Sequence, residues 1–69
     1  MNKKTEFLSL MVVEVQRKHE NVEPNLRFIN RNHIMQIWQD DNDIIILLSD
    51  YEKLKVQNEN IHVFMDRFV

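Results

Sequence analysis

The chain has 69 residues, no cysteine, no glycine and one proline, and its nine basic and eleven acidic side chains leave a net charge of −2. A chain of this length forms one domain, residues 1–69, and its small core leads us to expect help from self-association. Without cysteine it has neither disulfides nor thiolate metal sites, and without glycine it lacks phosphate loops, dinucleotide fingerprints and nucleophile elbows. The nearly neutral charge gives no electrostatic argument for nucleic acid.

The first residues resemble the start of a secretion signal, but Ser9 and Glu14 interrupt the apolar run that follows and no small-residue cleavage site is present. No stretch approaches the ~20 apolar residues that span a membrane. We therefore expect a cytoplasmic protein with no membrane contact.

Residues 7–17 are rich in β-branched and large apolar side chains and predict a first strand. Its faces alternate, with one made by Leu8, Leu10 and Val12 and the other by Met11, Val13 and Val15. A polar loop ending at Pro24 follows. Residues 25–30 predict a second, antiparallel strand, with Leu26 and Phe28 on one face and Arg27 and Ile29 on the other.

Residues 33–49 contain two apolar runs on either side of an acidic four-residue turn, residues 40–43, and predict an antiparallel hairpin. A single tight turn at residues 30–33 is expected to lead into it. Closing Gln39 against Ile44 predicts the pairs Trp38 with Ile45, Ile37 with Ile46, Gln36 with Leu47 and Met35 with Leu48.

The last two elements differ in their hydrophobic period. Residues 52–56 place Leu54 and Val56 inward and two lysines outward, which predicts an edge strand guarded by charge. Helical spacing then predicts a helix over residues 59–68 with Asn58 as its N-cap, and its apolar stripe is Ile61, Phe64, Met65 and Phe68. The helix is expected to cover an inner face made by Phe28, Ile37, Ile46, Leu48, Leu54 and Val56.

These elements predict an α+β fold: a curved, small-barrel-like antiparallel sheet of about five strands, with one C-terminal helix packed on it. In this arrangement Trp38, Ile45 and Leu47, together with Ile29, lie on the face away from the helix. An exposed apolar patch of this kind usually marks an interface, and tryptophan suits its centre. Two explanations remain open: a second copy or a protein partner buries the patch, or the sheet curls so that Met11, Val13 and Val15 cover it.

The segment 26–68 contains an ordered set of positions: Asn30, Ile34, Ile37, Ile46, Leu48, Asp50, Val56 and Glu59. It resembles the small FlbD-like bacterial proteins, in which a strand, an asparagine turn, an I-x-x-I step, an I-x-L-x-D strand, a V-x-E step and a C-terminal helix occur in this order. Glu59 is one place later than in the family, and Tyr51 replaces its turn glycine. The resemblance implies a small, self-associating accessory or regulatory protein and brings no catalytic residue.

Residues 28–34 are also similar to the F-x-R-I-N-R-x-x-I segment near the end of LytTR-type DNA-binding domains. Those domains are longer by several strands, so we rank this resemblance second. Arg17, Lys18, Arg27 and Arg31 form a candidate basic patch for a nucleic-acid backbone. Because Phe28 is expected to point inward, no stacking platform is predicted beside them, and an ordinary charged surface is favoured.

Neither a metal nor a cofactor is expected. The acidic turn has carboxylates suited to Ca²⁺ or Mg²⁺, but it lacks the glycine and distal glutamate of an EF-hand loop, so we interpret it as a solvated turn. His19, His33 and His62 are not spaced for a shared metal-binding face.

For function, the sequence favours a non-catalytic interaction or regulatory module that associates with itself or with a protein partner. We expect no small-molecule substrate and no enzyme, since a triad would require a serine next to a histidine, whereas Ser9 is within a strand and Ser49 at a strand end. Two competing classes are a nucleic-acid-binding accessory domain and a small phage or mobile-element inhibitor that occupies a protein surface.

Overall fold

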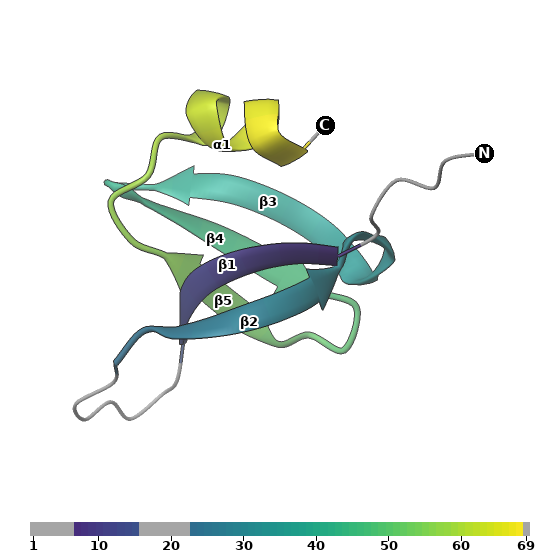
Figure 1. The fold of residues 1–69 in the computed structure, drawn as a ribbon. Coiled ribbons are helices and arrows are strands. Elements are labelled where there is room, and N and C mark those ends of the chain that lie inside the picture. The colour runs from purple at the N-terminus through teal and green to yellow at the C-terminus, as the bar shows by residue number, and fades with distance from the viewer. Residues whose placement is uncertain (1–6, 16–22, 69) are drawn as a thin grey trace.

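The computed structural model describes residues 7–15 and 23–68, which form one antiparallel sheet and one helix (Figure 1). The elements are β1 (Phe7–Glu14), β2 (Asn25–Asn30), the 3-10 turn η1 (Arg31–His33), β3 (Ile34–Asp40), β4 (Asp43–Leu48), β5 (Lys53–Val56) and α1 (Ile61–Phe68). This confirms the predicted α+β class, the five strands, the C-terminal helix and the tight turn before the central hairpin.

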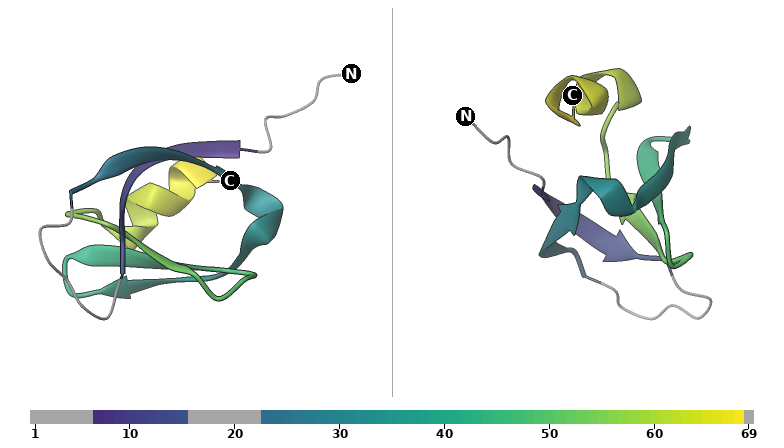
Figure 2. Two further views of the ribbon diagram at one scale, coloured as in Figure 1. Left: turned by 90° about the horizontal axis from the view of Figure 1, so that it is seen from below. Right: turned by 90° about the vertical axis from the view of Figure 1, so that its right-hand side faces the viewer.

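The strand order is β2-β1-β5-β4-β3, and all neighbours are antiparallel. β1 pairs with β2 along most of its length and with β5 at its end, where Val13 faces Lys55. The sheet curves strongly beneath the helix (Figure 2). It stays open, because β2 and β3 are its two edges, so the predicted barrel-like closure is not confirmed.

The prediction that residues 52–56 form an edge strand was wrong, because β5 lies between β1 and β4. Leu54 and Val56 are buried as expected, and Lys53 and Lys55 occupy the opposite face. Charges on a solvent-facing side of a strand do not obstruct its backbone hydrogen bonds, which lie in the plane of the sheet. The two lysines therefore leave both edges of β5 free to pair.

The β3–β4 hairpin has the predicted register at the four pairs from Gln39 with Ile44 to Gln36 with Leu47. The register then shifts, so Ile34 rather than Met35 faces Leu48 and Met35 forms a bulge. The turn is also tighter than predicted, because Asp40 pairs with Asp43. Asp41 completes it with φ of 63°, a conformation that aspartate tolerates better than most residues.

The core lies between the curved sheet and α1, and its fully buried side chains are Phe64, Ile44, Ile46, Leu54 and Val12. The helix stripe was predicted correctly, since Phe64 is 1% exposed while Ile61 and Met65 pack against the cluster. The predicted start was two residues early. Asn60, not Asn58, caps the helix, because its Oδ1 accepts a hydrogen bond from the N–H of His62 at 2.8 Å.

Candidate functional site

Four large apolar side chains lie exposed on the face of the β1–β2 pair that points away from the helix. We call this surface the β1–β2 outer face, and its members are Phe7, 51% exposed, Met11, 55%, Leu26, 54%, and Phe28, 67%. A chain of this size can bury only part of its apolar surface, so single exposed residues are ordinary. Four on one side of two paired strands form a contiguous patch, which is the usual mark of an interaction surface.

The strand register places these side chains next to one another. Met11 faces Leu26 directly, and Ser9 faces Phe28. Directly opposed side chains on one face are about 5 Å apart at Cβ, and diagonal neighbours remain within reach of large side chains. Phe28 is thus a diagonal neighbour of both Phe7 and Met11, and the small Ser9 leaves its ring uncovered.

Two sequence predictions about β2 were wrong, and they have one cause. Phe28 was expected inside and is exposed, whereas Ile29 was expected on the outer side and is 4% exposed in the core. The alternation along β2 was predicted correctly, but the assignment of its two faces was reversed. Leu8 of the core pairs with Ile29, and this pairing turns Ile29 and Arg27 inward.

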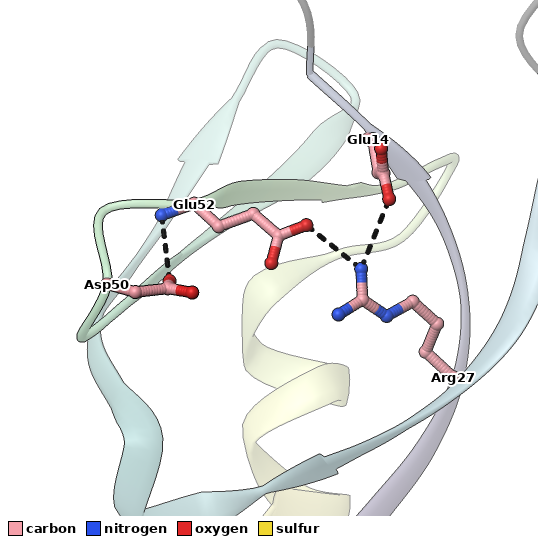
Figure 3. Close-up of polar contacts among 4 residues, drawn as sticks. All are labelled: Glu14, Arg27, Asp50 and Glu52. Carbon is pink, nitrogen blue, oxygen red and sulfur yellow. Dashed lines mark hydrogen bonds and ion pairs between the residues drawn. The ribbon is translucent and has the colours of Figure 1, made fainter.

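Arg27 has its own partners on the inner face (Figure 3). Its Nη1 lies 3.0 Å from Oε2 of Glu52 and 3.4 Å from Oε2 of Glu14, which joins β1, β2 and the start of β5. The hydrogen bond with Glu52 raises the pKa of Arg27, and the nearby carboxylates of Glu14 and Asp50 add to this effect. Oδ1 of Asp50 also accepts from the N–H of Glu52 at 3.1 Å.

A hollow of about 210 Å³ adjoins this cluster, and its lining includes Arg27, Phe28, His33, Asp50 and Glu52. The guanidinium there is hydrogen-bonded to carboxylates of this chain, so its charge is already compensated. We interpret the cluster as a structural link across the open end of the sheet, which fixes the outward direction of Phe28.

The predicted nucleic-acid patch does not come together as a free basic surface in the described part of the chain. Arg17 and Lys18 lie outside the described residues. Arg27 is held by Glu14 and Glu52. Arg31 lies with its Cζ 5.3 Å from the ring centroid of Phe68, in a cation–π contact that docks the end of α1.

The predicted interface residues Trp38, Ile45 and Leu47 do lie away from the helix, but they do not form the exposed patch that was expected. Ile45 is 5% exposed, and Trp38 and Leu47 are half-buried. Ile45 pairs with Trp38 on β3 and with Lys55 on β5. Lys55 pairs in turn with Val13 on β1, which is 9% exposed. An interface role for these residues remains a prediction.

The remaining candidate ligands serve local structure. In the acidic turn, Oδ1 of Asp43 accepts from the N–H of Asn58 at 3.0 Å, and its Oδ2 lies 3.9 Å from Nζ of Lys55. Nδ1 of His33 lies 2.7 Å from Oγ of Ser49, so the expectation that no serine lies next to a histidine was wrong. Because the N–H of Ser49 also donates to the carbonyl of His33 at 2.7 Å, this pair ties η1 to the end of β4.

His19 falls outside the described residues, and within the described ones no three histidine or acidic side chains gather as a metal site would require. The helix of the described chain is too short and too polar to cross a membrane.

The β1–β2 outer face was missed by sequence reasoning, although one signal for it was present. The face of β2 that carries Leu26 and Phe28 has no charged residue, whereas the other face carries Arg27. An arginine on an inner face requires acidic partners, and Glu14 shares the face of β1 that turns inward.

Comparison with known proteins found no matching family model, no matching curated protein and no matching solved structure.

Proposed function

We propose that this protein is a non-catalytic interaction module that binds protein surfaces through the β1–β2 outer face. The observation that carries the proposal is the exposure of Phe28, 67%, at the edge of a sheet and beside three other exposed apolar side chains. Aromatic side chains that are exposed in the free protein and buried on binding are typical anchors of protein interfaces. The resemblance to FlbD-like proteins supports an accessory or regulatory role for such a module.

The alternative of a nucleic-acid-binding domain receives less support. An exposed Phe28 supplies a ring on which a base could stack, but sequence-tolerant stacking platforms are flanked by free cations. Of the predicted basic patch, the two described residues are both engaged: Arg27 is compensated by two carboxylates and Arg31 packs on Phe68.

A photo-cross-linking amino acid at position 28 tests the proposal in cells that produce the protein. We expect irradiation to yield covalent adducts with a protein, identified by mass spectrometry as this chain or another one. The matched control carries the same group at Val63, which is 56% exposed on α1 and belongs to neither β1 nor β2. Adducts with nucleic acid at position 28, or no adducts beyond those at position 63, would overturn the proposal.

A further inference from the structure

The backbone of β2 ends the sheet and carries few of the features that normally prevent further pairing. Among the described strands β2 pairs only with β1. Its position beside β1 can be followed in Figure 1. An inward-pointing charge can protect an edge strand, but the single charged residue of β2, Arg27, is compensated by Glu14 and Glu52 of the same chain. By contrast, the other edge strand, β3, is interrupted by the bulge at Met35, a common device against edge-to-edge pairing.

We propose that β2 pairs antiparallel with β2 of a second copy of this chain, which makes one continuous sheet across a two-fold axis. The inference rests on the proposed function, because β2 supplies half of the β1–β2 outer face. An antiparallel pair of identical strands is isologous, so one unguarded edge provides both sides of the contact. Every other copy of the chain in solution therefore carries a strand that can pair with this edge.

The side chains of β2 select the register of this pairing. In a continuous sheet both copies turn the same face outward. An inward-facing residue can therefore only oppose an inward-facing residue of the other copy, and an outward-facing residue an outward-facing one. Centring the pair on Arg27 would oppose two arginines, which is destabilising. Centring it on Leu26 would oppose Phe28 to Pro24, which has no N–H for the ladder.

Centring the pair on Phe28 avoids both conflicts. The two Phe28 rings then face each other across the axis on the outer side, with Leu26 opposite Asn30 of the other copy. On the inner side Arg27 opposes Ile29 of the other copy, so its own ion pairs with Glu14 and Glu52 can persist. Aromatic cross-strand pairs are among the favourable ones in antiparallel sheets.

The proposed contact between the two β2 strands is small, so we expect a low affinity of dimerisation. β2 has six residues, so the paired segment is about one strand on each copy, at the low end of specific interfaces. The net charge of −2 per chain adds little repulsion. We therefore expect a dimer that dissociates on dilution in the micromolar range.

Sedimentation velocity of the full chain across micromolar and submillimolar concentrations tests this directly. The wild type is expected to shift from monomer to dimer. Phe28→Lys is expected to weaken association by about thirtyfold, the effect of losing an interface anchor. Val63→Lys is the matched control, since Val63 is 56% exposed on the helix and lies outside the proposed contact.

Because the chain has no cysteine, single thiols can report the register. Phe28→Cys is expected to form a disulfide-linked dimer on mild oxidation, whereas Met11→Cys, exposed on the inner neighbour strand β1, is expected to remain monomeric. Circular dichroism checks that each variant keeps its fold, and Leu26→Lys replaces Phe28→Lys if that variant unfolds.

A wild type that stays monomeric throughout, or equal cross-linking of Phe28→Cys and Met11→Cys, would overturn the inference. If the photo-cross-linker at position 28 nevertheless captures a different protein, the proposed function stands and only the second copy is excluded. If neither experiment gives an adduct, both proposals fail.

Discussion

Tyr51 occupies the turn between β4 and β5 with φ of 69°, in the left-handed region that suits glycine or asparagine. Its ring is 75% exposed, so no burial compensates for this conformation. Tyr51→Asn is therefore expected to raise the free energy of unfolding by about 0.5–1 kcal/mol. Urea unfolding of the monomer would measure the change.

Tyr51→Ala is the control for this prediction, because it removes the ring but keeps a Cβ at the same φ. Its stability is expected to match the wild type. A stabilisation by alanine equal to that by asparagine would show that the ring, and not the backbone conformation, is unfavourable.

The titration of Arg27 does not make the stability of the fold depend on pH near neutrality. The pKa of Arg27 is raised by its hydrogen bond with Glu52. A raised pKa contributes stability that is fully present below the ordinary value and is lost only as pH rises through the folded value. Both values lie far above neutrality for arginine, so its titration adds no pH dependence there.

Residue-level features were the least predictable from the sequence. The alternation of β2 was evident, but the choice of its inner face depended on pairing with β1 and on carboxylates from β1 and from the start of β5. A period-2 pattern with apolar residues in both phases does not identify its buried side. Leu26 and Phe28 are both apolar, whereas the other face carries the charged Arg27, yet the face with Arg27 and Ile29 turns inward, where Arg27 forms ion pairs with Glu14 and Glu52.

At the scale of elements, the side chain of Gln39 joins the β3–β4 turn to the helix. Its Oε1 accepts from the N–H of Ile61 at 2.8 Å, and its Nε2 donates to the carbonyls of Asp43 at 2.9 Å and Glu59 at 3.0 Å. Gln39→Ala leaves these backbone groups without that partner. We expect a loss of about 1–2 kcal/mol in the free energy of unfolding.

Hydrogen exchange locates this effect, since the amides of the first helical turn are expected to lose protection before those of β4. Gln36→Ala is the matched control, an exposed amide on the same strand. An equal loss for both variants would mean that Gln39 does not anchor the helix.

This link also explains why the helix start was mispredicted. The apolar stripe is a local pattern, and it was sufficient to place Phe64 against the sheet. The first turn, in contrast, is stabilised by Gln39 from another element and by Asn60, while Asn58 adopts φ of 53° and gives its N–H to Asp43. The position of β5 was missed for a similar reason, because strand order depends on contacts between distant segments.

At the scale of the whole molecule, the β1–β2 outer face is more exposed than the region around Trp38, Ile45 and Leu47 on the same side of the sheet. Ile45 is 5% exposed, so Ile45→Lys would place a charge in a buried site. We expect it to destabilise the monomer by more than about 2 kcal/mol, in contrast to a lysine at Phe28. Thermal unfolding at low concentration separates the two variants.

A folded Ile45→Lys monomer with an unchanged melting temperature would contradict this expectation. It would then favour the interface predicted at Trp38, Ile45 and Leu47.

The position of β1 between β2 and β5 has a consequence for the order of folding. The β3–β4–β5 meander uses only short connections, whereas the pairing of Val13 with Lys55 closes a loop across most of the chain. Long loop closures are slow because their entropy is lost before the contacts form. We therefore expect the meander to form early and β1 to dock late. During synthesis β1 and β2 emerge from the ribosome before β5, so a β1–β2 pair exposes the edge of β1 as well as that of β2 until β5 docks.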